Sequence, residues 1–310
     1  MTLKTLPLVA FGGVAAILAF TSHSEIPLTP EGSVAHAAFD KAPESHNGFV
    51  RCGVVDLTVA EAEAVERDID DRLRAAGISQ EEAEDSRIHV PVVVHVINEG
   101  ESEAQGNVTD AKIAEQMAVL SDAYAACGVT FSLDRVTRTT DARWYTMTPG
   151  SAEEAEAKET LHVDTSQYMN VYLAGIGQGL LGWATFPTNQ AEQPGMDGVV
   201  VLNTSLPGGS AAPYDEGDTL THEAGHWLGL YHTFQGGCVS QGDLVFDTSP
   251  ERFPAYGCPE SRDTCNRYGT DPVDNFMNYV DDACMNTFTF GQCLRISQIT
   301  AAYRPALLVE

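Results

Sequence analysis

The sequence predicts an α+β protein, and three features of the chain support this class. Residues 88–97 (I-H-V-P-V-V-V-H-V-I) are a strong β run. Residues 109–126 follow with apolar side chains at helical spacing. Further along, residues 222–232 (H-E-A-G-H-W-L-G-L-Y-H) carry three histidines and a glutamate in the pattern of a metal-binding helix and turn.

The first 24 residues have the pattern of a secretory signal. Lys4 precedes an apolar stretch at residues 6–20, which is too short for a comfortable membrane span. We expect cleavage near residues 22–24 or after residue 37, and an uncleaved N-terminal anchor is the alternative. No other stretch looks transmembrane. We therefore expect a secreted protein without stable membrane association once the signal is removed.

The charge of the chain excludes one class of partner. Lys and Arg number 17 against 44 Asp and Glu, which gives a net charge of −27. Phosphates would be repelled, so we expect no nucleic acid partner. The acidity is compatible with cationic peptide substrates or with calcium, and solubility alone is the alternative explanation.

Residues 58–76 predict a helix ahead of the main domain. Their apolar side chains recur at helical spacing, Thr58 can cap the helix and Gly77 ends it. A flexible leader at residues 25–50 precedes this helix, and a charged break at residues 81–87 follows it. We place a domain boundary at that break, so that residues 87–310 form the main domain.

The main domain alternates predicted strands and helices before it becomes irregular. The helix at 109–126 buries the stripe of Ile113, Met117, Leu120 and Tyr124. After residue 232 the chain is irregular until a helix near 294–303. The elements expected between these regions are strands at 129–136, 169–174 and 199–202, a short acidic helix within 149–160, an edge strand within 180–186 and a Gly/Ser/Pro loop at 203–217.

The motif at 222–232 predicts a catalytic zinc site. His222 and His226 are four residues apart, so a helix places them on one face. Gly229 lets the chain leave the helix sharply, and the turn brings in His232 as a third nitrogen ligand. Three protein ligands leave one position open, which is the catalytic arrangement. Glu223 lies where a general base for the attacking water is needed.

The spacing of this motif is specific. Its five fixed positions arise by chance on the order of once in 100,000 chains of this length. A helix that merely happens to carry histidines is therefore a poor explanation. Asp218 is expected to cap this helix at its N-terminus.

Seven cysteines in an exported chain predict disulfides with one cysteine left over. Four of them lie between residues 238 and 284, in an irregular stretch that needs cross-links. Cys52 stands far upstream and is the natural odd one. The sequence alone does not choose among the many pairings of the other six, which are Cys127, Cys238, Cys258, Cys265, Cys284 and Cys293.

The zinc motif together with N-F-M-N-Y at 275–279 resembles the metzincin metalloproteases. Metzincins carry a methionine beneath the metal, and Met277 matches it, although simple core packing is the alternative for this residue. Tyr279 resembles a tyrosine that stabilises the reaction intermediate. Further matching segments make the pappalysin family the nearest, and its short prokaryotic members the most similar. These segments lie at 181–187, 226–234, 236–238, 242–248, 257–259 and 281–285.

The resemblance, which covers about residues 87–300, implies a detailed fold. We expect a mixed twisted sheet with a backing helix and an active-site helix in an upper subdomain. An irregular, disulfide-stapled lower subdomain with a C-terminal helix would follow. The family also implies disulfides between Cys238 and Cys265 and between Cys258 and Cys284. Cys127 and Cys293 would then form a third pair.

The resemblance also implies a zymogen. Cys52, in R-C-G, resembles a cysteine switch, whose thiolate fills the fourth zinc position in the latent form. A spare thiol or an intermolecular disulfide is the alternative. The expected organisation is a signal peptide at 1–24, a pro-segment at 25–86 and a catalytic domain at 87–310. Cleavage between Ser86 and Arg87 would be self-processing.

Substrate contacts are expected at two places. The edge strand at Gly182, Trp183 and Ala184 would pair with an extended protein or peptide substrate. Short family members favour Arg or Lys just after the scissile bond. Asp281 and Asp282 are the expected acidic pocket residues, unless they simply face solvent or calcium.

Calcium is the second expected cofactor besides zinc. The loop at 241–248 has closely spaced oxygen ligands, and the family binds structural calcium nearby. Asp243 and Thr248 are the expected ligands, with Asp247 as a competitor. The spacing differs from that of an EF-hand.

The sequence therefore predicts a secreted zinc endopeptidase with Glu223 as general base. The rival from another class is a catalytically silent zinc-binding module for adhesion or scaffolding, which has no need of Glu223. An exopeptidase of another zincin group usually takes a distant Glu as third ligand, and His232 argues against it. Natural substrate and oligomeric state are not defined by the sequence.

Overall fold

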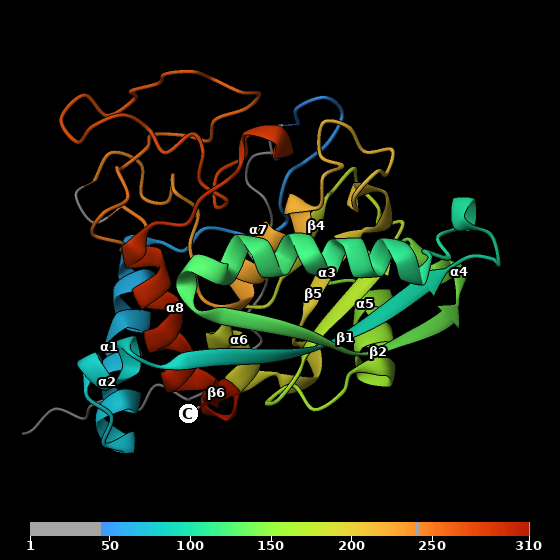
Figure 1. Cartoon of the computed structure of the whole chain (residues 1–310), viewed down its shortest axis with the longest axis horizontal. Helices are drawn as coiled ribbons and strands as arrows, with labels where there is room; N and C mark the ends of the chain where they lie inside the picture. The colour runs from blue at the N-terminus through green and yellow to red at the C-terminus, as the bar shows by residue number, and fades with distance from the viewer. Residues whose placement is uncertain (1–44, 240–241, 310) are drawn as a thin grey trace, which may run out of the picture. The chain divides into compact units, whose positions relative to one another are not determined.

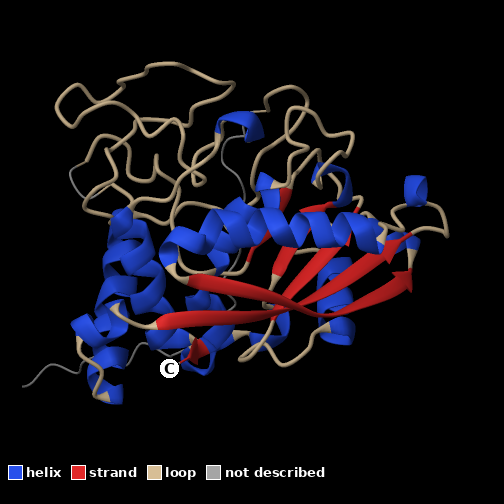
Figure 2. Cartoon of the chain, in the orientation of Figure 1, coloured by secondary structure: helices blue, strands red, loops and turns tan. Residues whose placement is uncertain are grey.

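A mixed, six-stranded sheet forms the centre of the protein in the computed structural model, which describes residues 45–239 and 242–309 (Figures 1 and 2). The predicted signal at 1–24 lies outside the described residues. The strands run in the order β2-β1-β3-β5-β4, and β6 pairs with β1. Their bounds are β1 Arg87–Asn98, β2 Val129–Thr140, β3 Met169–Ala174, β4 Gly182–Ala184, β5 Val199–Leu202 and β6 Leu308–Val309.

The sheet is parallel except at two places. Strand β4 pairs antiparallel with β5 and lies at the edge, as predicted for this segment. Strand β6 pairs antiparallel with Arg87 and Ile88, so the last residues of the chain hold the start of β1. Strand β2 runs beyond its predicted end because its pairing with β1 continues to Thr140. These features confirm the expected mixed sheet.

Helices cover both faces of this sheet. Helices α3 and α7 pack on one face with Val92, Val171 and Val201, and α3 is seen crossing in front of the strands in Figure 1. Helices α4 and α5 pack on the other face with Tyr172 and Val200. The helices are α1 Val59–Ala76, α2 Gln80–Glu84, α3 Asp110–Tyr124, α4 Ala142–Tyr145, α5 Ala152–Leu161, α6 Pro187–Glu192, α7 Asp218–Trp227 and α8 Phe290–Tyr303.

Local capping explains three differences from the sequence prediction. A break without helix was predicted at 81–87, but its first half is helical. Ser79 and Glu82 form a capping box that starts α2. Helix α8 begins at Phe290 because Thr289 forms a capping box with Gln292. The residue before α7 is Gly217 at φ 102°, so Asp218 lies in the first helical turn and is not the cap.

Disulfides hold the irregular part of the chain that precedes α8. Within the described residues, the stretch from 233 to 289 has no strand and only one short 3-10 helix, Asp282–Cys284. Cys238 is bonded to Cys265 and Cys258 to Cys284. The bond between Cys127 and Cys293 joins the end of α3 to α8. Cross-links restrict the unfolded chain and compensate for scarce regular structure.

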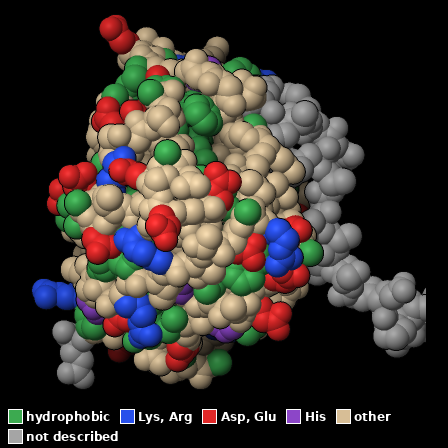
Figure 3. Space-filling model, turned by 90° about the vertical axis from the view of Figure 1, so that its right-hand side faces the viewer, with side chains coloured by type: hydrophobic (Ala, Val, Ile, Leu, Met, Phe, Trp, Pro, Cys, Tyr) green, Lys and Arg blue, Asp and Glu red, His purple; other side chains and the backbone are tan. Residues whose placement is uncertain are grey.

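On the face drawn in Figure 3, acidic side chains lie among basic and apolar ones and do not gather into one patch. In the part of the chain that the structure describes, no helix is both long enough and apolar enough to cross a membrane.

A buried ion pair fixes the end of helix α7. The Asp197 carboxylate accepts hydrogen bonds from Trp227 Nε1 at 3.0 Å and from both terminal nitrogens of Arg304, at 2.8 and 3.0 Å. The Arg304 guanidinium also lies 3.8 Å from the Trp227 ring centroid. Asp197 precedes β5 and Arg304 follows α8, so this pair joins three separate segments.

Replacing Asp197 by Ala should destabilise the protein by about 3–5 kcal/mol, because Arg304 would remain buried without its counter-charge. Denaturant unfolding measures this change. Asp134→Ala is the matched control: its pair with Arg135 is exposed, and the expected effect is below about 1 kcal/mol. Equal effects of the two substitutions would contradict the role given to the buried pair.

Candidate metal centre and cleft

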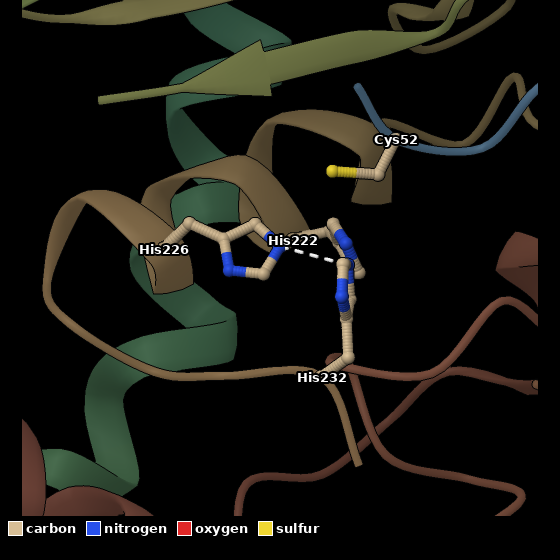
Figure 4. A group of neighbouring side chains, drawn as sticks. All are labelled: Cys52, His222, His226 and His232. Carbon is tan, nitrogen blue, oxygen red and sulfur yellow. Dashed lines mark hydrogen bonds between the residues drawn. The ribbon is translucent and has the colours of Figure 1, made fainter. Parts of the chain in front are cut away.

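Three histidines and one cysteine converge in the interior. Ligand atoms of His222, His226, His232 and Cys52 all lie within 4.8 Å of one another, and each residue is buried (Figure 4). His222 and His226 come from α7, and His232 comes from the turn that follows it. The His226 and His232 Nε2 atoms are 3.0 Å apart. In Figure 4 the Cys52 sulfur points toward the space between the rings.

The far nitrogen of each ring is fixed by an acceptor. His222 Nδ1 is 2.7 Å from the Phe276 carbonyl oxygen, and His226 Nδ1 is 2.8 Å from that of Leu230. His232 Nδ1 is 2.6 Å from Asp56 Oδ1. Such acceptors hold Nδ1 as the donor and leave Nε2 free to bind a metal.

The cluster fits a zinc ion. His222 Nε2 is buried without a hydrogen-bond partner, so this nitrogen lacks the contact that a metal would supply. Burial lowers the pKa of His222 and His226 well below the usual value, which keeps both rings in the neutral, ligating form. Three imidazoles and a thiol are ligands that zinc prefers.

Glycines make room for this arrangement. Gly229 has a φ of 94°, which an L side chain rarely adopts, and the Ile299 side chain fills the space where its Cβ would be. A Cβ on Gly225 would come within 2.4 Å of Met277 Sδ. Met277 is fully buried against α7, beneath the helix turn that carries His222 and His226.

Glu223 lies in the same buried space. Cys52 Sγ lies 3.4 Å from Glu223 Oε2 and donates to it, and Oε1 has no partner. Burial raises the pKa of Glu223 to about 8. Gly182 packs against it, since a Cβ there would lie 2.8 Å from Glu223 Cγ. The Tyr279 hydroxyl is 3.2 Å from His232 Nε2 and thus also lies beside the cluster.

The chain upstream of α1 runs along the edge strand. Val50 forms a parallel bridge with Leu180, and the Gly53 amide donates to the Gly182 carbonyl at 2.8 Å. Cys52 stands between these two contacts. This pairing holds the thiol over the histidines and covers the backbone of the predicted substrate strand.

Arg51 occupies a buried acidic site next to the cluster. Its Nη1 atom donates to Asp282 Oδ1 at 3.0 Å and to Thr219 Oγ1 at 3.1 Å. The guanidinium also lies 4.9 Å from the Tyr214 ring centroid, and Nη2 lies 3.2 Å from Met285 Sδ. Burial raises the pKa of Asp282, and Arg51 opposes that rise.

Two sequence predictions are refined by this geometry. Asp282 contacts Arg51, whereas Asp281 Oδ1 is buried without a partner. The Trp183 side chain points away from the histidines, because its Nε1 donates to Glu154 Oε1 at 2.7 Å and its ring joins the cluster on the other face of the sheet. The sequence reasoning missed Arg51 and Asp56 as site residues, although Arg51 stands within the R-C-G motif.

The predicted calcium ligands lie together on the loop after residue 241. Asp243 Oδ2 and Thr248 Oγ1 are both buried without a hydrogen-bond partner. Burial raises the pKa of Asp243 to about 7. Asp247 is engaged elsewhere, since its carboxylate accepts from the Gly291 amide in the first turn of α8.

Comparisons with known proteins agree with this geometry. The family model described as "Pregnancy-associated plasma protein-A" matches residues 153–301. The chain is 44% identical over 222 residues to extracellular metalloprotease 1 of Coccidioides posadasii, covering 70% of this chain and 78% of that protein. An extracellular metalloprotease of Pyricularia oryzae is 37% identical over 266 residues, covering 85% of this chain and 88% of the relative.

Solved structures of mirolysin are also similar to this chain. A mutant of Tannerella forsythia promirolysin is 29% identical with a TM-score of 0.66, covering 83% of this chain and 96% of that one. Mature mirolysin with a cleaved peptide is 30% identical with a TM-score of 0.60, covering 73% of this chain and all of that one, 100%.

The antiparallel edge strand, the helix with its glycine turn and third histidine, and the methionine beneath it define a metzincin. The sequence relatives described above identify the family within this class. The chain belongs to the pappalysin family, and it is a metalloendopeptidase.

Proposed function

We propose that the protein is a secreted zinc endopeptidase made as a zymogen. Residues 1–24 are the signal, 25–86 the pro-segment and 87–310 the catalytic domain. The observation that carries this proposal is the placement of Cys52 among the three histidines while its neighbours pair with the edge strand. The curated relatives are named extracellular metalloproteases, and promirolysin is by its name a precursor.

For the catalytic step, His222, His226 and His232 would hold a zinc ion, and Cys52 would be its fourth ligand in the latent form. The ion would supply the acidification of a water molecule and the polarisation of a carbonyl group. Glu223 accepts the proton of the attacking water and passes it to the leaving amine.

Two further groups orient the substrate. The Tyr279 hydroxyl donates a hydrogen bond to the oxygen that becomes negative during attack. The backbone of Gly182, Trp183 and Ala184 pairs with an extended peptide once the pro-segment has left. The hydrogen bond from the Gly53 amide to the Gly182 carbonyl supports this pairing, because an extended segment occupies the same strand edge.

Glu223→Gln should lower kcat by about 100-fold to 10,000-fold while zinc content stays unchanged, because the amide accepts no proton but leaves the ligands in place. The measurement is peptide hydrolysis together with zinc analysis, after residues 1–86 have been removed by an added protease. Glu159→Gln, at an exposed position of α5, is the control. Full activity of Glu223→Gln would refute the assignment.

We further propose a preference for Arg or Lys just after the scissile bond. Asp282 provides the negative charge, and Thr219 and Tyr214 line the same site. Arg51 supports this proposal because it occupies the site with a guanidinium, the group that a substrate arginine would present. A buried carboxylate without a cation is costly, so a basic side chain is favoured there.

Asp282→Asn should lower kcat/KM about 100-fold or more for peptides with Arg after the scissile bond, because a buried charge pair is lost. Peptides with Leu there should change by less than about tenfold. Profiling of cleavage sites in a peptide library measures both. Asp281→Asn is the matched control and should keep the preference. A uniform loss over all peptides would rule out the specificity role of Asp282.

We also propose a structural calcium ion bound by Asp243 and Thr248. Their two unpartnered buried oxygens support the proposal. Calcium prefers oxygen ligands and would satisfy both atoms. The ion would add to the nearby charge of Arg295 in stabilising an ionised Asp243 in the interior.

Without calcium, the raised pKa of Asp243, about 7 against 3.8, makes the folded state bind a proton more tightly than the unfolded state. Asp243 therefore reduces the free energy of unfolding as pH rises from about 4 to about 7. Calcium requires the carboxylate, so it should raise Tm more at about pH 8 than at about pH 5. Thermal unfolding with calcium or with chelator tests this. Asp243→Asn should remove most of the difference, and an unchanged calcium effect in that variant would contradict the site.

A further inference from the structure

The pro-segment has a second contact with the catalytic domain, away from the histidines. Helices α1 and α2 pack against α8, where the blue and cyan helices meet the red one in Figure 1. Ile69, Leu73 and Ala83 form a buried cluster there with Ile299 and Ala301. These side chains would be exposed if the helices left, so the contact is a true apolar interface.

Polar contacts surround this cluster. Glu66 Oε1 is 2.8 Å from Arg295 Nη2, and Gln298 Nε2 donates to Glu84 Oε1 at 2.8 Å. The Tyr303 hydroxyl donates to Asp68. An apolar centre with a polar rim is the usual anatomy of a specific interface.

The catalytic domain holds its side of this interface by itself. Arg295 Nε donates to the Gly229 carbonyl at 3.1 Å, and its guanidinium lies 4.7 Å from the Tyr231 ring centroid. Ile299 packs against Gly229. Arg295 and Ile299 on α8 are therefore held by contacts that do not involve the pro-segment.

Both contacts come from residues that precede the proposed activation site in the sequence. Arg51 and Cys52 form the first and residues 58–84 the second, while the bond between Ser86 and Arg87 comes after both. The connecting residues 53–57 span roughly 17 Å when extended. Gly53 and Asp56 among them contact Gly182 and His232, whereas Val55 is 50% exposed. Two sites joined by a short linker raise each other's effective concentration to about millimolar.

We propose that the face of α8 is a docking surface for residues 58–84 and that it holds the pro-segment after the first cut. Cleavage between Ser86 and Arg87 then yields a latent complex of two chains. Activity follows when a second cut in the exposed linker separates the two contacts. This inference rests on the proposed zymogen function.

The test uses the full chain with Glu223→Gln, so that no self-processing occurs. A recognition sequence for an unrelated protease is inserted between Ser86 and Arg87, the protein is cut, and native size exclusion is followed by mass analysis. The cut pro-segment should elute with the catalytic domain. Complete separation of the two chains in one passage would overturn the proposal.

Leu73→Asp should speed dissociation of the cut pro-segment by about tenfold to 100-fold, because it places a charge in the apolar centre. Ala75→Asp, at an exposed position of the same helix, is the matched control and should behave as the parent. Glu66→Ala, which removes the partner of Arg295, serves as a second variant if Leu73→Asp perturbs folding. Equal dissociation of all variants and the control would also overturn the proposal.

The readout is independent of catalysis, so the two proposals fail in different ways. If the docking inference is wrong, the segment leaves at once, or it is held through Arg51 and Cys52 alone and dissociates equally fast with Leu73→Asp and Ala75→Asp. If the zymogen function is wrong, the chain with its natural Glu223 gains no peptidase activity even after residues 1–86 have been removed completely.

Discussion

Three imidazoles share one fully buried space, and much of the surrounding structure depends on this constraint. Each ring must donate from Nδ1 so that Nε2 faces the others. The acceptor for His222 is the carbonyl of Phe276, which is distant in sequence. The acceptor for His226 is the carbonyl of Leu230, in the tight turn after the helix. The orientation of the histidines on the zinc helix therefore depends on the glycine turn and on the segment around Met277. Gly225 illustrates this dependence, because Met277 packs where a Cβ would otherwise be.

Some buried polar groups beside the histidines are likewise satisfied by protein partners. Arg51 neutralises a carboxylate that would otherwise stay buried and uncompensated, and Gly53 satisfies the carbonyl of Gly182. Both contacts are of the kind a basic peptide would make. Under the proposed function, latency and specificity would draw on one set of groups, because a bound substrate would have to satisfy the same buried acceptors as Arg51 and Gly53.

The sequence predicts the parts of this site that are local. The zinc residues lie within one helix and turn, so their spacing alone defines the geometry. Cys52 is visible as the unpaired cysteine. The pair of Arg51 and Asp282, by contrast, is separated by 231 positions, and no periodicity reports such a contact. Trp183 lies on the predicted substrate strand, and strand alternation turns its side chain toward Glu154. Helix α2 was missed because a local capping box outweighed the charged composition.

One ligand differs from the other two in a way that matters for activation. The Nδ1 atoms of His222 and His226 rest on carbonyls of the catalytic domain, whereas that of His232 rests on Asp56 of the N-terminal segment. In the proposed activation, removal of residues 1–86 would take the acceptor from His232 alone. In the full chain its ring also stacks on Phe234, at 4.7 Å between centroids and 11° between planes, and contacts Tyr279 at 5.0 Å. Aromatic packing would then orient this ring in place of the carboxylate.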